Sequence, residues 1–531
     1  MKKKIRIAIV YNDKNNLWQK KIISEIKNLN CCQLTHVIKA PKKKETDSLI
    51  FNFFVKLDKY IFTRLQRNAR SLKVTTSELF KDIPELCINN FSTNTFKGYE
   101  LDLVLNLTDD KLPKHFLNIS VYGIWFFSHC DLDKINKRPY IIWEMLSKQP
   151  EIVSTLRMLK KNEVYVNTID QTSICLDKIS YSRNLINIKN QTIPLIIDNL
   201  KLLSSNELLF QEKIRTKSKI FPLKSATLPY NPPSNLNILY YVIKLYTKKL
   251  FQTLNDFFYF YQWTIIFNSD ESEIYNYKKY KQIKTSKDKF WADPFLIKHN
   301  NRYYIFFEEL IYKRKLGHIS VMEIDKHGKH TQPIKILEKD YHLSYPFVFL
   351  DNGTYFMIPE SSGNKDIQLY ECIKFPYEWK FKKTLMTGVS AVDTTIYKDG
   401  DTYWMFTNMK KHEENSKNIQ LHLFSSTSLF SNQWTPHPLN PIINDVKNSR
   451  PAGKIFKDND LIIRPSQNCS NHYGYGLNLS QINELNESAY AETVIKSITP
   501  NWDPNIISTH TTNKVDHLDV SDIKIKRSKF F

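Results

Sequence analysis

The chain has 531 residues, of which 41% are hydrophobic and 13% aromatic, so it is long enough for two domains with packed interiors. It has no stretch of about 18 or more uncharged apolar residues, so we expect no membrane-spanning helix. The net charge of +22 indicates either an anionic partner or a generally lysine-rich composition. No nucleic-acid-binding motif accompanies it, and we expect no nucleic-acid partner.

The first residues, MKKKIRIAIV, have the charged start of a signal peptide. However, Arg6 interrupts a short apolar run and no small-residue cleavage site follows, so we interpret residues 5–10 as a β-strand. We expect a cytoplasmic protein, free or peripheral to the inner membrane. The seven cysteines are scattered without a CxxC pair or zinc spacing, which predicts a reduced compartment and no metal or other cofactor.

Residues 1–200 alternate apolar strands with amphipathic helices. A helical pattern beginning at Leu17 follows the first strand, and further apolar strands are expected over 101–107 and 121–127. This alternation predicts an α/β open sheet with ligands at the carboxyl ends of its strands. No GxGxxG or GxxxxGK loop follows a strand, so a nucleotide phosphate site is not indicated.

The segment GIWFFSHCDLDKINKRPYIIWEMLSKQPEIVSTLRML resembles the catalytic strand of the formyltransferases. The resemblance implies that His129 matches the catalytic histidine, which works with an Asn and an Asp as a proton relay. Phe126 or Phe127 occupies the Asn position, and residues 161–164 contain no Asp. We therefore expect a degenerate formyltransferase-like sheet with a non-catalytic His129. The alternative is N-formyl or acyl transfer to an amino sugar by His129.

Residues 201–262 form a predicted linker. The prolines between residues 228 and 233 mark a boundary, and an amphipathic helix is expected over 236–258. Its apolar stripe is predicted either to dock one domain onto the other or to contact an anionic membrane surface.

Residues 263–531 change to strands and turns that recur about every 50 residues. Similar segments are FWADPFLIKHNNRYYIFFEE, LSYPFVFLDNGTYFMIPES, VSAVDTTIYKDGDTYWMFTN and SRPAGKIFKDNDLIIRPSQN, with a weaker copy near His510. Such repeats are typical of propeller blades, and five units fit the length. We predict an all-β five-bladed propeller in which a strand over 263–267 closes the ring with the last blade.

Residues at the start of each innermost strand of a propeller form a ring around one channel. Asp293, Tyr345, Asp393 and Arg450 occupy the same place in successive copies, at steps of 52, 48 and 57 residues. Two carboxylates flanking a sugar can divide acid and base work, so Asp293, Asp393 and Glu360 are catalytic candidates. The predicted substrate-binding residues provide stacking, hydrogen bonds or a positive charge for a phosphate: Trp291, Tyr345, Arg450, Arg464 and His510.

The stretches WADPF, HLSYPFVF with MIPES, RPAGKIF and RPSQNCSNHYGYGL resemble the arabinanase/levansucrase-like five-bladed propeller superfamily. They look most like the N-terminal domain of glucosamine inositolphosphorylceramide transferase. In the hydrolases of this superfamily the fourth blade supplies a glutamic acid as proton donor, whereas Ser449, Arg450 and Pro451 stand there in this chain. The resemblance therefore implies a fold that binds sugars. It also implies that this chain lacks the proton donor for simple glycoside hydrolysis, unless Glu360 takes that role.

These observations favour a carbohydrate-active protein of cell-envelope glycan or polysaccharide biosynthesis. We expect it to be a transferase that moves a glycosyl group while the propeller channel holds a sugar or sugar phosphate. A non-catalytic glycan-binding module is the second interpretation, and formyl or acyl transfer by His129 is the third.

Overall fold

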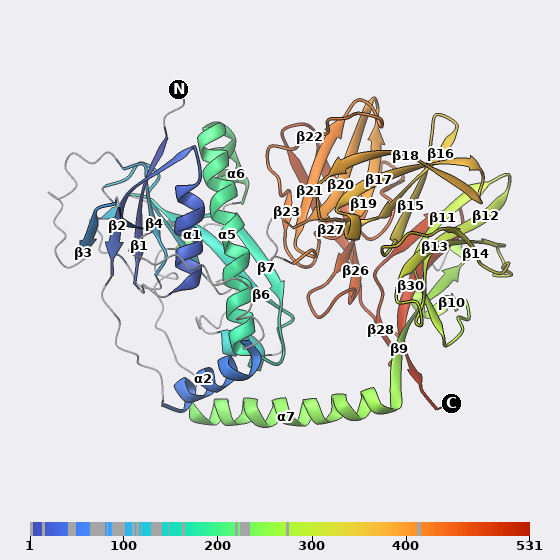
Figure 1. Ribbon diagram of the computed structural model, residues 1–531, viewed down its shortest axis with the longest axis horizontal. Helices are drawn as coiled ribbons and strands as arrows, with labels where there is room; N and C mark the ends of the chain where they lie inside the picture. Colours follow the sequence, from blue (N-terminus) through green and yellow to red (C-terminus); the bar gives the residue numbers. More distant parts are fainter. Residues whose placement is uncertain are drawn as a thin grey trace. The chain divides into compact units, whose positions relative to one another are not determined.

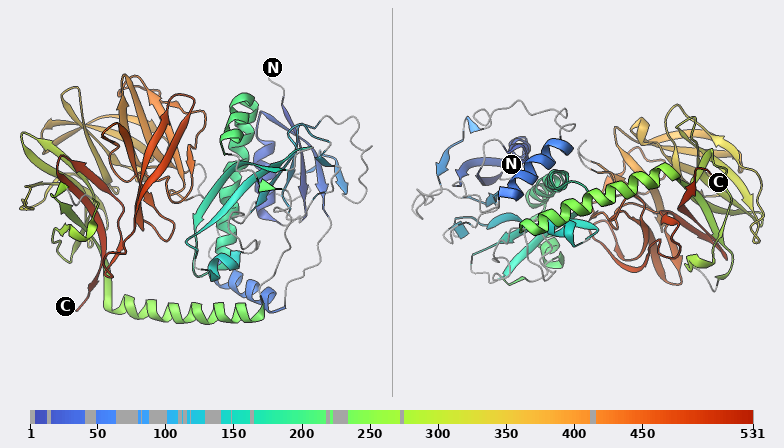
Figure 2. Two further views of the ribbon diagram at one scale, coloured as in Figure 1. Left: turned by 180° about the vertical axis from the view of Figure 1, so that it is seen from behind. Right: turned by 90° about the horizontal axis from the view of Figure 1, so that it is seen from below.

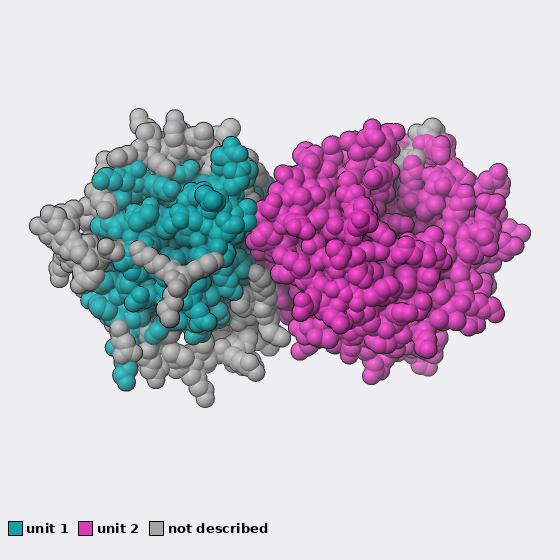
Figure 3. Space-filling model, turned by 90° about the horizontal axis from the view of Figure 1, so that it is seen from above, with its two compact units in different colours: residues 1–248 teal, residues 249–531 magenta. Residues whose placement is uncertain are grey.

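The computed structural model describes residues 4–12, 16–40, 49–63, 80–81, 83–87, 101–108, 112, 116–117, 119–128, 141–147, 149–161, 165–217, 221–222, 234–271, 275–410 and 416–530. Two compact units divide the chain, residues 1–248 and residues 249–531 (Figure 3). Within the described ranges, no helix has the length and apolar character needed to cross a membrane.

The first unit is built on a sheet whose described strands run in the order β3-β2-β1-β4-β5-β6-β7-β8 (Figure 1). Strands β1 to β5 pair in parallel with one another, whereas β6, β7 and β8 each pair antiparallel with the strand before them. This confirms the predicted α/β open sheet. The strands are β1 (Ile5–Tyr11), β2 (Cys32–Lys39), β3 (Glu85–Cys87), β4 (Leu103–Asn106), β5 (Ile124–Ser128), β6 (Glu151–Leu159), β7 (Tyr165–Cys175) and β8 (Phe221–Pro222).

Helices cover this sheet, and side chains cap the starts of two of them. Asn16 accepts a hydrogen bond from the amide of Trp18 at the start of α1, and Ser180 accepts one from the amide of Arg183 at the start of α5. Helix α5 packs against β6, β7, α1 and α2. The described helices are α1 (Leu17–Lys27), α2 (Leu49–Thr63), α4 (Ile141–Leu146), α5 (Tyr181–Ser205), α6 (Glu207–Lys217) and α7 (Asn235–Phe258).

The predicted linker over 201–262 contains regular structure. Its first residues complete α5, α6 follows at once, and the first unit extends to Lys248 within α7. The predicted helix over 236–258 is present as α7. The prolines at 228–233 lie outside the described residues.

The second unit has five sheets, each with a meander of antiparallel strands, which confirms the five-bladed propeller. The first blade contains β11 (Lys289–His299), β12 (Arg302–Ile311), β13 (Gly317–Ile324) and β14 (Ile334–Leu337). The second contains β15 (Ser344–Asp351), β16 (Thr354–Glu360), β17 (Asp366–Lys374) and β18 (Glu378–Thr387). The third contains β19 (Ala391–Asp399), β20 (Thr402–Met409), β21 (Gln420–Ser426), β22 (Thr435–Pro436) and β23 (Ile443–Asn444). The fourth blade contains β24 (Phe456–Asp458), β25 (Leu461–Asn468), β26 (Gly476–Leu485) and β27 (Tyr490–Ile498). The fifth contains β28 (Ile506–Ser508), β29 (Thr512–Val515) and β30 (Leu518–Ser528), together with β9 (Tyr259–Asn268) and β10 (Lys281–Gln282).

Short polar turns connect the first two strands of the blades. Asn300, Asn301 and Asn352 have φ of 47°, 58° and 46°. The φ angles of Gly353 and Gly400 are also positive. Tight hairpins whose twist matches the strands need positive φ, which Asn and Gly adopt most readily. The polar turns noted in the sequence therefore set the positions of the blades.

The ring closes between the two ends of the second unit. Strand β9 pairs with β30 from Tyr259 opposite Ser528 to Asn268 opposite Asp519 (Figure 2). This confirms the predicted closing strand. Ile265 and Val520 at this junction are wholly buried in one apolar cluster with Phe307 of the first blade.

Replacing Ile265 by Ala tests the closing junction. Ile265 is 0% exposed, so the change leaves a cavity, and we expect the free energy of unfolding of the propeller to fall by about 2–5 kcal/mol. Urea unfolding followed by tryptophan fluorescence measures this loss. Ile334→Ala is the matched control, because Ile334 is 47% exposed and its truncation should change stability by less than about 0.5 kcal/mol. Equal losses in both variants would contradict the assignment of this junction as core.

Candidate functional site

A bulge repeats in the innermost strands of the first three blades. The pairing register shifts between Ala292 and Phe295 in β11, and equivalent shifts occur in β15 and β19. Asp293, Tyr345 and Asp393 lie in these bulges with φ of 52°, 43° and 52°. Positive φ is unfavourable for such residues and persists only where the surroundings enforce it, often at functional sites. The predicted equivalence of these three positions is thus confirmed.

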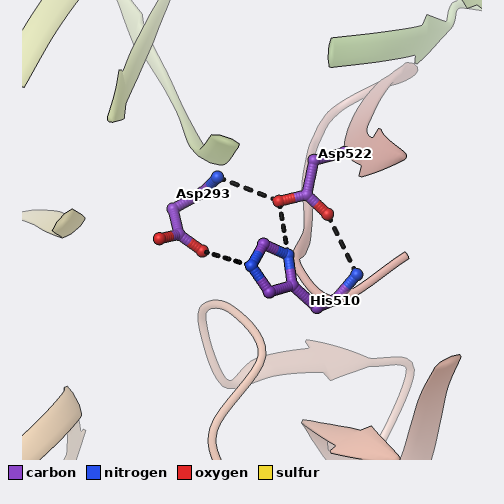
Figure 4. Close-up of side chains that lie close together, drawn as sticks. All are labelled: Asp293, His510 and Asp522. Atoms are coloured by element: carbon purple, nitrogen blue, oxygen red, sulfur yellow. Dashed lines mark hydrogen bonds and ion pairs between the residues drawn. The ribbon is translucent and has the colours of Figure 1, made fainter. Parts of the chain in front are cut away.

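Asp293 meets His510 and Asp522 of the last blade (Figure 4). The Nδ1 of His510 lies 2.6 Å from Oδ2 of Asp522, and its Nε2 lies 3.6 Å from Oδ1 of Asp293. Asp522 also accepts hydrogen bonds from the backbone amides of Asp293, His510 and Thr511. On its other side, the His510 ring stacks on Trp263 of β9, with 4.0 Å between ring centroids. Two carboxylates and an indole therefore fix the imidazole.

Burial and charge shift the pKa values of this group in a consistent way. Burial would lower the pKa of His510, but the charges of Asp522 and Asp293 raise it to about 9. Burial also raises the pKa of Asp293, and the charge of His510 opposes that shift. At neutral pH His510 is thus a cation held between two acids.

Asp293, His510 and Asp522 could together offer three ligand atoms to a metal ion, since these atoms lie within 4.8 Å of one another. The hydrogen bonds argue against this use. Both oxygens of Asp522 already accept backbone amides, and Oδ2 also pairs with the His510 ring. A cationic His510 would have to lose a proton before a ring nitrogen could bind a metal, which lowers the affinity for one near neutral pH. The three side chains fit an ion-pair network better than a metal site.

A second group forms around Asp393 on the opposite part of the ring. Arg450 donates from Nε and Nη2 to the two Asp393 oxygens, and Gln467 donates to Asp393 Oδ2 at 2.8 Å. Arg450 also lies 3.5 Å from Oε2 of Glu360 and donates to Asn418. The structure therefore brings the predicted residues Asp393, Glu360 and Arg450 together.

Asp393 has an unusual acidity for a carboxyl group. Burial raises its pKa most, Arg450 opposes this, and the neighbouring Glu360 raises it again, giving a pKa of about 7. A carboxyl group with such a pKa can both give and take a proton near neutral pH.

Tyr473 joins the two groups, and sequence reasoning missed it. Its ring lies 4.9 Å from the guanidinium carbon of Arg450 and 5.5 Å from the His510 ring centroid. The side chain is nevertheless 43% exposed, whereas Asp293 and Asp393 are almost wholly buried. An exposed aromatic ring above buried carboxyl groups is a suitable platform for a sugar.

Glu308 and Glu360 occupy equivalent places in the first two blades, opposite Ala292 and Ser344. Glu308 pairs with His342 at 3.0 Å. Burial raises the pKa of Glu308, His342 opposes that shift, and the charge of Asp293 adds to it. Glu308 therefore belongs to the same acidic site.

Three predicted substrate-binding residues lie in the protein interior instead. Trp291 is buried in the apolar cluster of the closing junction, and its indole donates to Glu309. Arg464 makes two hydrogen bonds to Glu492 and one to the Asn448 carbonyl, so its charge is already neutralised. Tyr345 is 0% exposed.

The Tyr345 hydroxyl contacts Thr395 and receives a hydrogen bond from the Gly453 amide. Tyr345 thus supports the site from within, since its own amide donates to Asp293 Oδ2 at 3.2 Å. The predicted contacts of Trp291, Tyr345 and Arg464 with substrate stay predictions, because Asp293 and Asp393 of the site are similarly buried.

The placement of Arg450 also differs from the prediction. Pro451 pairs with Ser466 where Ala292 pairs with Glu308, so Arg450 precedes the bulge position in its blade. Gly453 has the positive φ there, and a Cβ on it would lie 2.0 Å from the Thr512 carbonyl oxygen. The long Arg450 side chain still reaches Asp393. Arg450 therefore belongs to the site because of the length of its side chain and not because it occupies the bulge position.

His129 lies outside the described residues, directly after β5. Its predicted role therefore stays a hypothesis.

The residues that sequence reasoning missed follow two patterns. Tyr473 lies within the stretch RPSQNCSNHYGYGL, in a loop whose direction the sequence does not give. Asp522 and Trp263 lie on β30 and β9, whose pairing brings them beside His510.

Residues 279–528 match the family described as Glucosamine inositolphosphorylceramide transferase 1, N-terminal. The predicted resemblance is confirmed. The proteins named Glucosamine inositolphosphorylceramide transferase 1 from Arabidopsis thaliana and Oryza sativa subsp. japonica are 32% and 31% identical to this chain over 209 residues, or 39% of it. These stretches cover 27% and 28% of the relatives, so the match spans about a quarter of their length.

Solved structures give more distant similarities. The catalytic domain of a GH62 α-L-arabinofuranosidase from Coprinopsis cinerea aligns with a TM-score of 0.35 and 10% identity, over 46% of this chain and 95% of that one. An exo-1,5-α-L-arabinanase from a bovine ruminal metagenomic library aligns at 0.31 and 14%, over 46% and 95%. A phosphoribosylglycinamide formyltransferase from Anaplasma phagocytophilum aligns at 0.28 and 10%, over 38% and 89%.

Asp393→Asn tests the raised acidity of this carboxyl group. An unfolded aspartate has a pKa of about 3.9, whereas Asp393 titrates at about 7 in the fold. The folded protein therefore holds this proton more tightly, and Asp393 makes stability fall as pH rises from about 4 to 7. We expect the variant to lose this part of the pH dependence, measured by urea unfolding at several pH values. Parallel curves for the two proteins would contradict the raised pKa.

Proposed function

We propose that the propeller binds a sugar at the site formed by Asp293, Asp393, Glu360, Arg450 and Tyr473. The observation that carries this proposal is the exposed Tyr473 ring beside the buried carboxyl groups. Sugars offer hydroxyl groups to carboxylates and C–H faces to aromatic rings, so both features suit them. The family match supports the same substrate class.

The charge of the site favours a neutral or amino sugar over a sugar phosphate. The pKa values of Asp293, Glu308 and Asp393 are all raised, chiefly by burial, and each also feels the charge of at least one neighbouring acid. The Arg450 charge is already shared between Asp393 and Glu360. A phosphate would add negative charge to a crowded acidic site, whereas an ammonium group would relieve it. We therefore expect Arg450 to position Asp393 and Glu360 and not to bind a phosphate.

We further propose that the protein acts in glycosyl transfer during glycan biosynthesis. In such a transfer the bond from the anomeric carbon to the donor's leaving oxygen breaks, and a bond to the acceptor oxygen forms. A carboxyl group with a pKa near 7, such as Asp393, can protonate the leaving oxygen, and a neighbouring carboxylate can accept the acceptor's proton. The name of the matched relatives, glucosamine inositolphosphorylceramide transferase 1, supports an amino sugar and a lipid-linked acceptor.

A non-catalytic glycan-binding module is the second candidate. It is favoured by the extent of the match, because about three quarters of each relative lies outside it and the family description places the matched part at the N-terminus. Transfer chemistry in those proteins need not reside in the propeller. A formyltransferase-like origin of the first unit stays a hypothesis. Formyl or acyl transfer by His129 stays a hypothesis.

Tyr473→Ala tests the sugar site. Removing the stacking surface should weaken binding about tenfold, equivalent to about 1.4 kcal/mol. Calorimetry with free sugars, amino sugars, nucleotide sugars and sugar phosphates measures the affinities of wild type and variant. Tyr377→Ala is the matched control, since Tyr377 is 44% exposed and lies between β17 and β18 of the second blade. Unchanged affinity in Tyr473→Ala, or tightest binding of a sugar phosphate, would contradict the proposed site.

Asp393→Asn separates the two candidate functions. For an enzyme, we expect the ligand that wild type binds to remain bound while formation of the glycosylated product falls at least 100-fold. Chromatographic detection of the glycosylated product measures turnover. For a binding module, wild type itself forms no product, and the substitution changes affinity only.

A further inference from the structure

Helix α7 has two apolar faces, and the protein buries only one of them. Ile238 and Tyr241 are 2% and 3% exposed, and the Tyr241 hydroxyl donates to the Ile179 carbonyl of the first unit at 3.0 Å. The Tyr241 ring also packs against Phe54 of α2. This face docks the helix onto the first unit, as one of the two sequence interpretations predicted.

The second face of α7 stays open along the whole helix. Ten of its apolar side chains are 48–77% exposed: Leu236, Leu239, Tyr240, Ile243, Tyr246, Leu250, Phe251, Leu254, Phe257 and Phe258. At about 3.6 residues per turn, these positions fall within roughly 140° of the circumference and extend for about 36 Å. Soluble proteins seldom expose a continuous apolar stripe of this size without a partner for it.

Helix α2 adds a second stripe in the first unit. Its exposed apolar side chains recur at helical spacing: Leu49, Ile50, Phe53, Leu57, Tyr60 and Ile61. Helix α2 and the start of α7 lie side by side at one end of the first unit, where Phe54 meets Tyr241 (Figures 1 and 2). At the far end of α7, Phe530 adds a 59% exposed ring beside Phe257 and Phe258.

The charges beside these stripes are almost all positive. Helix α7 carries Lys244, Lys248 and Lys249 but a single acid, Asp256. Burial lowers the pKa of Lys248, and the neighbouring charges of Lys178 and Lys244 lower it further. The one acid of α2, Asp58, is buried and accepts hydrogen bonds from Ser180 and Ser182 at the start of α5. A surface with unbalanced lysines is complementary to negative charge.

We propose that the open face of α7 binds the surface of an anionic lipid bilayer. An apolar stripe rich in aromatic side chains and flanked by lysines is the arrangement that lies in the boundary between lipid headgroups and acyl chains. A second copy of the chain fits less well, because an interface between two α7 helices would bring lysines against lysines. The inference goes beyond the sugar site, which involves none of these residues.

Vesicle flotation of the full chain tests the proposal. We expect wild type to bind phosphatidylcholine vesicles containing phosphatidylglycerol at least tenfold more tightly than vesicles of phosphatidylcholine alone, with weaker binding at high salt. The variant Ile243→Glu, Leu250→Glu, Leu254→Glu should lose this binding at least tenfold. Its three side chains are 55%, 62% and 48% exposed, so its folding should be unchanged. An unchanged midpoint of urea unfolding checks that the variant is folded.

The matched control places the same substitutions on exposed apolar residues of the propeller. Leu350, Ile373 and Val494 are 55%, 60% and 41% exposed, and their replacement by Glu should leave vesicle binding unchanged. Equal losses of vesicle binding in both triple variants would show that the effect depends only on the change in net charge. That result would overturn the proposal. Wild type that floats with neither vesicle would overturn it too. A wild-type dimer in light scattering that the α7 variant dissociates would assign the stripe to a second copy instead.

Discussion

The pairing of β9 with β30 is the interaction on which the rest of the second unit depends. It joins residues more than 250 positions apart into one sheet, and it turns a row of blades into a closed ring. Because β9 comes from the start of this unit and β30 from its end, the last blade is complete only when the two ends of the unit meet. The buried side chains of Ile265 and Val520 hold this junction together through apolar contact with the first blade.

The candidate site lies on the same junction. Asp293 belongs to the first blade, whereas His510 and Asp522 belong to the last, and Trp263 of β9 covers the imidazole. The backbone amide of Asp293 donates to Asp522, so the ion-pair network is itself an interaction between the two ends of the ring. Stability and site geometry are thus linked, and loss of closure would separate these three side chains.

The site combines several acids with few cations. Burial makes each ionised carboxyl group costly, and the neighbours of Asp293 and Asp393 supply one imidazolium and one guanidinium. Raised pKa values are the result, and they leave protons available near neutral pH. The same excess of negative charge is the physical reason to expect a neutral or amino sugar. It also contrasts with the lysine-rich surroundings of α7, so the net charge of +22 is not distributed evenly between the two surfaces.

The sequence by itself determined the α/β sheet, the five blades, the closing strand and the positions of Asp293 and Asp393, because strand periodicity and turn residues are local signals. It also indicated that α7 is amphipathic, but only the fold shows that one of its faces docks while the other stays open. Arg464 and Trp291 looked suitable for a ligand, yet Glu492 and Glu309 engage them in the interior. Tyr473, Asp522 and Trp263 reach His510 from three different segments. Such meetings depend on blade closure and loop direction, which no local pattern of residues encodes.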